Sequence, residues 1–599
     1  MIVRSCSPRR RSGVNLFSLF VIWVACRRMS LVEVIREIEN MAKTTGSDLL
    51  IRALRAESVD TVFGIAGDHI LHMLDTMFDA PLRMVDFRHE SGAVHAADSY
   101  SRILKKGGVM LSTTPGHANA LPGLANAMHS EAPVINISGS AESINMGRGA
   151  MQEFDQIGAA KPITKGAWDV PSPARIPEYV ALAFRTALSG RQGPVHLTIP
   201  HDFQMTEVDD AEVARYAPNE YGTPMQVLGD PAQIDRAIDV LNSAKRPVIF
   251  AGSSAGATAI PAEVQRLVET MRIPFFSEDS ARALIPDSHE YSMGLGYQPL
   301  NLAVRNVGDA DVVLMLGKKL DYTNGFGGNP PFADDTKFVV VDPSPAQVAR
   351  ARTAAVGIVG DVGPIVTQMA DAAEKRNWDE RTEWVEMMRT AFENWHSGLA
   401  ELGKSEDPMH PMHVSNVLQK FIDDDTHVTF DGGDYCHFLR ASIKRDAPYR
   451  FHNVSSFGMI GVGLPYAVGA QVALPDSKVI LANGDGSLGF NGMEIDTMVR
   501  HNLSVKMFVG NNSIWGIDWQ IQKGLYGRPV WTDLLPTRYD VMAQGLGAHG
   551  EHVTKAEDLE GAMKRAFAYD GPALLNIDIE QVISPVAEAA ISRKTGSHG

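Results

Sequence analysis

The sequence has little cysteine and, after its first forty residues, no long apolar run. Only three of its 599 residues are cysteines: Cys6, Cys26 and Cys436. One cysteine in the body of the chain cannot build a disulfide framework or a cysteine zinc site, which favours a reducing cytoplasm. Basic blocks are also missing after residue 30, and the net charge is −16. We therefore expect a cytoplasmic protein that does not bind nucleic acid.

The first forty residues differ from the rest. Residues 16–26 (LFSLFVIWVAC) form an apolar run of 11 residues flanked by arginines, whereas a bilayer-spanning helix needs about 20. The run is a signal peptide, a short membrane anchor, or the result of a start codon placed too far upstream, with Met29 or Met41 as the true start. The change of composition after Met41 favours the last interpretation. Residues 1–40 are thus an extension of doubtful status, and we expect no membrane contact.

The remaining chain has the composition of a globular protein, with 44% hydrophobic and 21% charged residues. Short apolar runs alternate with helical stretches, which predicts parallel sheets covered by helices on both faces. The expected fold class is α/β, with three doubly wound parallel-sheet domains. The clearest predicted strands are 61–65, 83–87, 109–113, 133–138, 196–199, 247–251, 311–316, 337–342, 427–430, 478–482, 505–509 and 573–577.

Changes in composition suggest the domain limits. We expect a first domain over 41–210, a central domain over 225–373, a linker helix over 374–407 and a third domain over 408–585, followed by a tail from 586. Residues 207–229 are acidic and interrupted by prolines, which is typical of a linker. Trp378, Trp384 and Trp395 mark a packed face of the linker helix. The tail is either a lid over the active site or a frayed terminus.

The most specific motif lies in the third domain. A predicted strand runs into Asn483-Gly484-Asp485-Gly486-Ser487, and 24 residues after Ser487 a second strand ends at Asn511-Asn512. Glycines permit a tight turn and a close approach to a phosphate. The carboxylate between them can hold a hard divalent cation, together with amide and main-chain oxygens. Ligands bind at this edge of open α/β sheets, where neighbouring strands end.

This pattern resembles the metal–diphosphate motif of thiamine diphosphate-dependent enzymes. The resemblance implies that Asp485 and Asn512 bind Mg²⁺ through their side chains and Ile514 through its carbonyl. It also implies that Gly484, Gly486 and Ser487 belong to the cofactor site. The three domains then correspond to the pyrimidine-binding, central and diphosphate-binding domains of that family.

A second motif, DFRHESGAVHAADSYSR, places Glu90 where a predicted strand meets a helix. Taken alone, this glutamate makes a favourable contact with a helix dipole. In the family, the residue at this position activates the cofactor. The resemblance implies that Glu90 shares a proton with N1′ of the aminopyrimidine, which favours the imino form that removes the C2 proton.

Two further segments resemble the family. Thr114-Pro115-Gly116 matches its Gly-Pro-Gly loop, so Gly116 is a cofactor-binding candidate. The next residue, His117, departs from the usual small residue there; it is either a catalytic candidate or a solvated histidine at a helix N-terminus. In the segment 459–465, Ile460 would force the cofactor into its bent shape, and otherwise it is an ordinary core residue.

The order of domains resembles acetolactate synthases, and GFNGMEIDTMVRHNL and MQEFDQ resemble 2-hydroxyacyl-CoA lyase and oxalyl-CoA decarboxylase more closely. PITK at 162–165 fits acetolactate synthases equally well. The resemblance implies a lyase or carboligase that acts next to a carbonyl of a 2-hydroxyacyl-CoA or a 2-oxoacid. Gln152 is a substrate-side catalytic candidate. Asp68 and Asp518 favour the alternative of a simple 2-oxoacid decarboxylase of the pyruvate decarboxylase kind, but the paired histidines of that kind are missing from 139–154.

The resemblance also bears on assembly and on a second ligand. In the family, the cofactor lies between the first domain of one subunit and the third domain of another, which implies a homodimer or homotetramer. The central domain of relatives binds FAD, ADP or nothing, and the sequence does not decide among them. A non-catalytic paralogue is the competing class of function, against which the intact Glu90, Asp485 and Asn512 argue.

Overall fold

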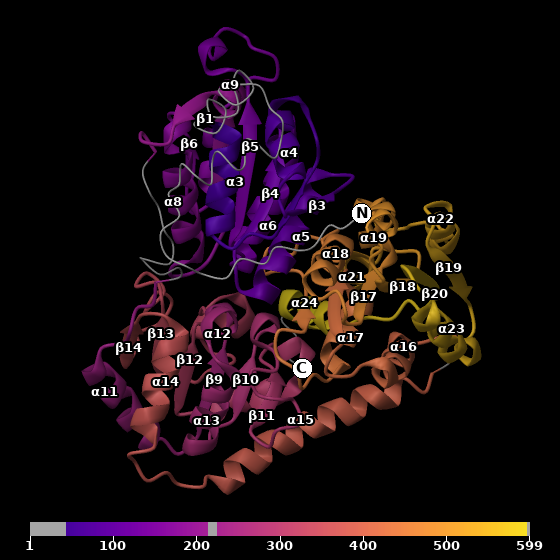
Figure 1. Ribbon diagram of the computed structural model, residues 1–599. Coiled ribbons are helices and arrows are strands. Elements are labelled where there is room, and N and C mark those ends of the chain that lie inside the picture. The colour runs from indigo at the N-terminus through magenta and orange to yellow at the C-terminus, as the bar shows by residue number, and fades with distance from the viewer. Residues whose placement is uncertain (1–42, 214–224, 406, 596–599) are drawn as a thin grey trace, which may run out of the picture.

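The computed structural model describes residues 43–213, 225–405 and 407–595. Three six-stranded sheets, each with all strands parallel, follow one another along the chain and are flanked by helices (Figure 1). The expected fold class is confirmed. The interpretations of the apolar run at 16–26 lie outside the described residues. Across the described part of the chain, no helix has the length and apolar character needed to cross a membrane.

The first sheet has the order β3-β2-β4-β5-β7-β6. Alternate residues of β4 pack on opposite faces: Val109 and Leu111 lie in the core beneath α3 (Gly46–Ala56) and α8 (Ile176–Leu188). Met110 lies in the core beneath the helices of the other face, α5 and α6. The sheet is therefore covered on both sides. Its strands are β2 (Thr61–Gly64), β3 (Arg83–Asp86), β4 (Gly108–Ser112), β5 (Val134–Ser140), β6 (Ala167–Asp169) and β7 (Val195–Pro200), and the two helices are α5 (Glu90–Leu104) and α6 (Thr114–Ser130).

The third sheet repeats this order with different residues. It reads β16-β15-β17-β18-β20-β19, so the second, first, third, fourth, sixth and fifth strands lie side by side as in the first sheet. The central sheet instead reads β11-β10-β9-β12-β13-β14, the order found in dinucleotide-binding folds. The third sheet comprises β15 (His427–Asp431), β16 (Phe451–His452), β17 (Val479–Gly484), β18 (Lys506–Asn511), β19 (His549–Val553) and β20 (Ala573–Asp578). The central strands are β9 (Pro247–Ala251), β10 (Phe275–Ser277), β11 (Ser292–Leu295), β12 (Val312–Leu316), β13 (Lys337–Asp342) and β14 (Val356–Val359).

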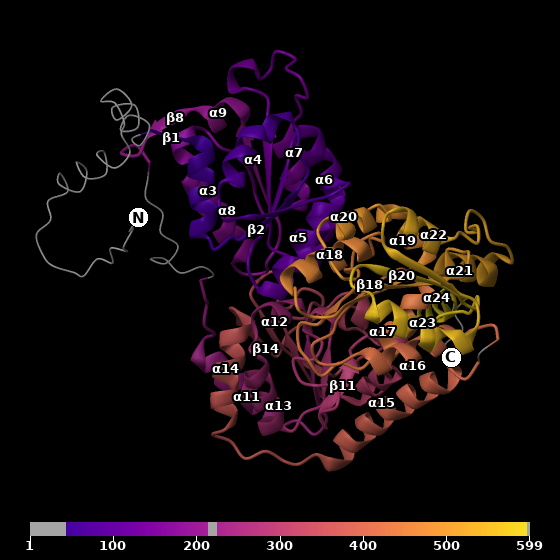
Figure 2. The ribbon, with the colours of Figure 1, turned by 45° about the vertical axis from the view of Figure 1, so that its right-hand side comes forward.

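Helices α5 and α18 (Gly463–Ala473) join the first and third domains of the chain (Figure 2). Their backbones approach closely because Gly469 faces Ala96: a Cβ at Gly469 would lie 2.2 Å from the Ala96 carbonyl oxygen. Residues of both domains consequently share one apolar core. This packing fixes the position of each sheet edge relative to the other.

Within the expected linker segment 374–407, the structure has the helix α15 (Thr382–Leu402), which runs beneath the central and third domains (Figure 1). Its tryptophans are anchored as well as packed. The indole N–H of Trp384 donates to the Pro247 carbonyl at 2.9 Å, and that of Trp395 donates to the Leu300 carbonyl at 2.8 Å.

Two connecting segments contain regular secondary structure. Residues 207–209 of the expected linker form β8 (Glu207–Asp209), which pairs antiparallel with β1 (Lys43–Thr45) because Val208 buries its side chain there. The tail is not frayed over 585–595. It forms α24 (Pro585–Thr595), which packs against α21 (Gly516–Tyr526) and α17 (Asp434–Ser442) of the third domain.

Candidate active site

The carboxyl edge of the third sheet carries Asp485 immediately after β17, where α19 (Asp485–Asn491) begins. The side chain is 3% exposed. One carboxylate oxygen accepts the Gly486 N–H at 3.0 Å, and the other accepts the Ser513 N–H at 2.9 Å. Burial raises the pKa of Asp485 to about 6, because these backbone groups offset the loss of water only in part. Asp485 is thus a buried carboxylate that no Lys or Arg side chain of the described residues pairs with.

The Asn512 region lies next to Asp485, as the motif spacing predicts, since β17 and β18 are hydrogen-bonded neighbours. Ser513, which binds Asp485, stands between Asn512 and Ile514. The Asn512 side-chain oxygen accepts the Ile514 N–H at 3.3 Å. In the described part of the chain, no three His, Cys, Asp or Glu side chains gather as a metal cluster. A hard cation here would therefore depend on one carboxylate, one amide and one carbonyl, a donor set that suits Mg²⁺.

A cavity of about 570 Å³ opens over this edge. Gly484, Gly486, Ser487 and Ile460 line it together with Asp485, Asn512 and Ile514. Gly486 is required because the loop is crowded there: a Cβ at this position would lie 2.6 Å from the Trp515 ring. The volume and the glycine-lined wall fit a cofactor with a diphosphate.

Asp431, at the end of β15, supports the same wall, although the sequence analysis did not identify it. One carboxylate oxygen accepts the N–H groups of Gly461 at 2.9 Å and Gly463 at 2.7 Å. Gly461 has φ +90°, which favours glycine, and the two bonds fix the segment that presents Ile460. Burial raises the pKa of Asp431 to about 7.

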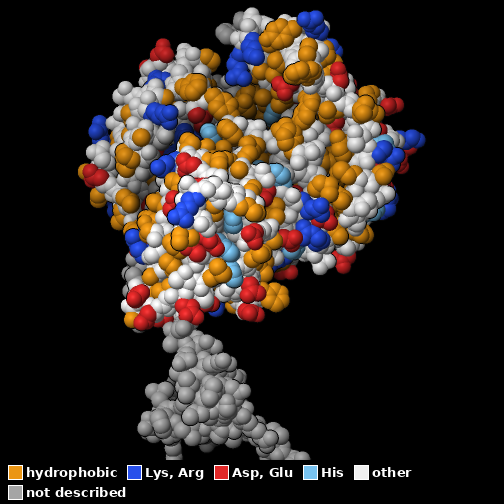
Figure 3. Space-filling model, turned by 90° about the horizontal axis from the view of Figure 1, so that it is seen from above, with side chains coloured by type: hydrophobic (Ala, Val, Ile, Leu, Met, Phe, Trp, Pro, Cys, Tyr) orange, Lys and Arg blue, Asp and Glu red, His pale blue; other side chains and the backbone are white. Residues whose placement is uncertain are grey.

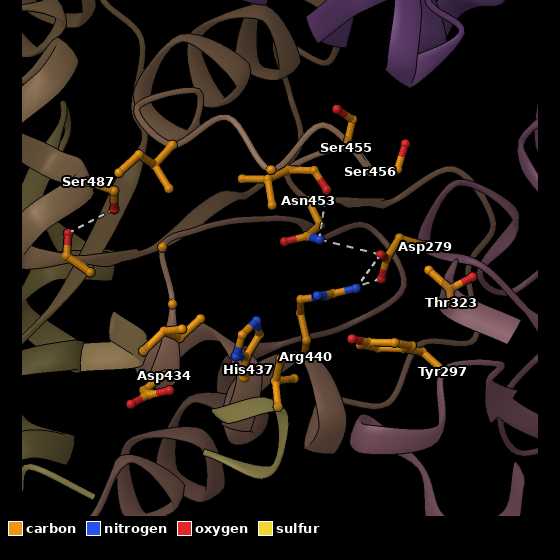
Figure 4. Close-up of a pocket in the computed structure, with 18 of the residues that line it drawn as sticks. Asp279, Tyr297, Thr323, Asp434, His437, Arg440, Asn453, Ser455, Ser456 and Ser487 are labelled. Atoms are coloured by element: carbon orange, nitrogen blue, oxygen red, sulfur yellow. Dashed lines mark hydrogen bonds and ion pairs between the residues drawn. The ribbon is translucent and has the colours of Figure 1, made fainter. Parts of the chain in front are cut away.

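Figure 4 shows the part of the cavity that faces the central domain. Arg440 pairs with Asp279 at 2.5 Å, and the Asn453 amide donates to the same carboxylate at 3.4 Å. Asp434 lies on the opposite wall, 3% exposed, and burial raises its pKa to about 7, an effect that the neighbouring Ser584 offsets only in part. Sequence reasoning missed Asp434 and Arg440. The signal for Asp434 was its place just after a strand that neighbours β17.

The carboxyl edge of the first sheet carries Glu90, the first residue of α5. The side chain is half-buried and accepts a hydrogen bond from the Asn119 amide at 3.1 Å. Gly116 packs against it, since a Cβ at Gly116 would lie 2.8 Å from Glu90 Oε1. The structure therefore brings together Glu90 and Gly116, which lie in different motifs.

His117 is fully buried, so its interpretation as a solvated histidine is wrong. The ring stacks on His196 with centroids 3.9 Å apart, and the Asn136 amide nitrogen lies 2.9 Å from His117 Nδ1 and 2.8 Å from His196 Nδ1. His117 Nε2 faces the Gln156 carbonyl at 3.2 Å. One NH₂ group can donate to both rings only if both are neutral, and burial lowers the pKa of His117 to about 4 accordingly.

The other candidates of the first domain are exposed. Asp68 begins a single helical turn, and Gln152 has φ +60° in a loop that Glu153 closes by accepting the Gly147, Gly149 and Ala150 N–H groups. Within the described residues, Glu90, Asp68 and Gln152 do not line the cavity that contains Asp485. One chain therefore presents the two groups of candidates at separate places.

The carboxyl edge of the central sheet lies on the far side of the cavity. Arg191 of the first domain donates to Asp342 at the end of β13 and to the Gly317 carbonyl, and it pairs with Glu131 at 2.5 Å. Lys318 pairs with Glu278 at 2.6 Å and with Asp321 at 3.0 Å. The charged groups at this edge are thus paired with one another.

Family models match each of the three parts. The match over 44–159 is described as "Thiamine pyrophosphate enzyme, N-terminal TPP binding domain", that over 234–369 as the central domain of the same enzymes, and that over 431–577 as their C-terminal TPP binding domain. The site residues Glu90, Gly116, Asp485 and Asn512 fall inside the matched ranges.

Known proteins match nearly the whole chain. A probable acetolactate synthase of Mycobacterium bovis is 32% identical over 535 residues, which cover 88% of this chain and 94% of that protein. A 2-hydroxyacyl-CoA lyase of Arabidopsis thaliana is 29% identical over 92% of this chain and 97% of its own length. An oxalyl-CoA decarboxylase of Escherichia coli is 28% identical over 92% and 96%, respectively.

Proposed function

Because the chain belongs to the thiamine pyrophosphate enzyme family, we propose that it is a Mg²⁺-dependent lyase or carboligase that cleaves or forms a carbon–carbon bond next to a carbonyl. The substrate is a 2-hydroxyacyl-CoA or a 2-oxoacid, as the names of the relatives suggest. The observation that carries the proposal is the buried Asp485, which has only backbone partners and stands beside Asn512 at the glycine-lined wall of the cavity.

In this proposal the third domain binds the metal and the diphosphate of the cofactor, and the first domain activates the cofactor. Asp485, Asn512 and the Ile514 carbonyl would hold Mg²⁺, while Gly484, Gly486 and Ser487 would face the diphosphate. When bound, thiamine diphosphate supplies an electron sink for the substrate carbon. Ile460, fixed through Asp431, would set the shape of the bound cofactor, and Glu90 would hold a proton at its pyrimidine ring. The buried His117 supports the first turn of α6, which contains Gly116.

The proposed active unit is a homodimer or a homotetramer. Glu90 and Asp485 of one chain do not share a cavity, so the first domain of a second chain would complete the site. Exposed apolar side chains on both domains suit such a contact, including Ile144 at 69% and Trp531 at 97% exposure. Figure 3, seen from above the first domain, shows hydrophobic patches gathered beside a hollow. Gln152 and Asp68 would then reach the substrate of the neighbouring subunit.

Two further proposals concern the surroundings. The edge of the central sheet is the place for FAD or ADP, where Arg191 would have to exchange its acidic partners for phosphate. An absorbance spectrum of the purified protein and a titration with ADP would test this. The cytoplasm is the proposed compartment, since Cys436, the one cysteine among the described residues, is free and buried.

The test of function is turnover by the purified protein with thiamine diphosphate and Mg²⁺. One arm supplies pyruvate and measures acetolactate and acetaldehyde; the other supplies a 2-hydroxyacyl-CoA and measures free aldehyde and the acyl-CoA product. Acetaldehyde alone would support the simple decarboxylase. The position of Asp518 in the cavity wall favours that alternative. A protein that binds the cofactor but converts none of these substrates would support the non-catalytic paralogue.

A further inference from the structure

Glu494, the first residue of α20 (Glu494–Arg500) in the third domain, contacts the first domain of the same chain. Its carboxylate lies against the turn between β3 and α5, which leads directly into Glu90. Glu494 Oε1 accepts the N–H groups of Arg88 and His89, both at 3.2 Å, and Oε2 lies 3.3 Å from the same Arg88 nitrogen. The side chain is 1% exposed, so these bonds form away from water.

A glycine permits this approach. A Cβ at Gly92, in the first turn of α5, would lie 2.9 Å from Glu494 Oε1 and would displace the carboxylate. On the other side, the Thr497 hydroxyl donates to Glu494 Oε2 at 2.6 Å and holds the side chain in place. The contact is thus shaped by residues of both domains.

Charged pairs surround the contact without replacing it. Arg88 pairs with Asp496 at 3.1 Å, and Asp86 pairs with Arg500 at 2.5 Å and faces His501 at 2.9 Å. Each pair has one well-exposed member, and ion pairs open to water contribute little to stability. In the described part of the chain, the Arg88 and His89 N–H groups have no acceptor other than Glu494. The backbone that carries Glu90 therefore depends on this one buried carboxylate.

We infer that Glu494 is a positioning residue for Glu90: it fixes the backbone from which the cofactor-activating carboxylate projects, and so couples the metal-binding domain to the acid of the first domain. The inference rests on the proposed role of Glu90. Glu494 itself lies behind the turn and outside the cavity, so it acts through Glu90. Small displacements matter because a proton-sharing group that is misplaced by about 1 Å can lose about 100-fold in rate.

The test compares Glu494→Ala with Glu494→Gln. A glutamine oxygen at the Oε1 position keeps both backbone bonds, and its amide can face Thr497, whereas alanine removes every bond. We expect Glu494→Ala to slow hydrogen–deuterium exchange at C2 of bound thiamine diphosphate by about 10- to 100-fold. The dissociation constant of the cofactor should change less than about twofold, since Asp485 and Asn512 are untouched. Glu494→Gln should exchange within about twofold of the wild type.

Two measurements keep the inference testable if Glu494→Ala folds poorly. Gly92→Ala leaves the carboxylate in the chain but pushes it away from the turn, so it should slow C2 exchange in the same direction. Amide hydrogen exchange of the peptide around Arg88 and His89, measured by mass spectrometry without cofactor, should be faster in Glu494→Ala and normal in Glu494→Gln. Asp496→Asn, on the same helix, is the matched control and should leave both readouts unchanged.

The double variant Glu90→Gln/Glu494→Ala separates the possible failures. If Glu494 acts through Glu90, the double variant exchanges at C2 no more slowly than Glu90→Gln alone. Additive effects, or wild-type exchange in a folded Glu494→Ala protein while Glu90→Gln is slow, would overturn the inference and leave the role of Glu90 intact. Wild-type exchange at C2 in Glu90→Gln would overturn both the inference about Glu494 and the proposed role of Glu90.

Discussion

The first and third sheets have the same strand order, yet their carboxyl edges are chemically opposite. The first edge presents the half-buried Glu90 above a neutral pair of stacked histidines, His117 and His196. The third edge buries three carboxyl groups, Asp431, Asp434 and Asp485. The shared scaffold therefore does not determine the chemistry. In the proposed enzyme, the edge of the third sheet offers oxygen ligands to a metal and binds a diphosphate. The edge of the first sheet offers a single carboxyl group to the pyrimidine ring.

The largest expected effect comes from the third edge. Asp485→Asn removes the one anionic ligand of the proposed Mg²⁺ site, so thiamine diphosphate should bind at least about 100-fold more weakly in Mg²⁺ buffer. Turnover should fall below detection at ordinary cofactor concentrations. Isothermal titration of the apoprotein with thiamine diphosphate measures this directly. An unchanged affinity would remove the metal assignment and, with it, the contrast between the two edges.

At the first edge, Glu90→Gln should behave differently. Turnover should fall by roughly 10²–10⁴, the usual contribution of a positioned acid–base group, because an amide cannot share a proton with the cofactor ring. Cofactor affinity should stay near the wild-type value, since the change is isosteric and Glu90 is remote from the proposed metal ligands Asp485 and Asn512. Asn119→Asp, which perturbs the hydrogen-bond partner and keeps Glu90, is a useful companion variant. A Glu90→Gln enzyme that turns over normally would reduce Glu90 to a helix-end carboxylate.

These two variants also test whether the edges meet between subunits. Each variant alone should keep at most about 1% of the wild-type activity. Random pairing in a dimer gives mixed dimers in about half of the cases, and each of these has one site free of both changes. About a quarter of the wild-type activity should therefore return after the two chains are unfolded and refolded together. Two Glu90→Gln preparations mixed in the same way serve as the control. An active monomer by light scattering would exclude the arrangement.

Motif spacing predicted the contact between Asp485 and the Asn512 region because neighbouring parallel strands bring such loops to the same edge. It could not identify Asp431 or Glu494, since both bind backbone N–H groups of segments far away in sequence. No local pattern indicates such partners. The burial of His117 was missed for a related reason: it depends on the packing of α6 over β5 and β7, which carry Asn136 and His196. The strand β8 pairs with residues more than 160 positions earlier, and the acidic, proline-rich sequence around it does not indicate that pairing.

The smallest expected effect sharpens the comparison most, because the two edges should respond to pH with opposite signs. Asp431 has a pKa of about 7 in the folded protein, against an ordinary value of 3.8, so the folded state holds its proton more tightly. Its contribution to stability is complete below the lower value and is lost as the pH rises through 7. His117 has a pKa of about 4 in the folded protein, against an ordinary value of 6.5. Its contribution is complete above 6.5 and is lost as the pH falls toward 4.

Replacing each group by a neutral analogue should expose these slopes in the apoprotein. We expect the melting temperature of Asp431→Asn, relative to the wild type, to rise between pH 5 and pH 8, because only the wild type must ionise a buried carboxyl. The melting temperature of His117→Gln, relative to the wild type, should rise in the other direction, from pH 8 to pH 5. Each trend corresponds to about 2 kcal/mol over the range, at about 1.4 kcal/mol per pKa unit. Differential scanning calorimetry at four pH values measures both, and trends of the same sign would mean that the edges do not differ in the protonation they bury.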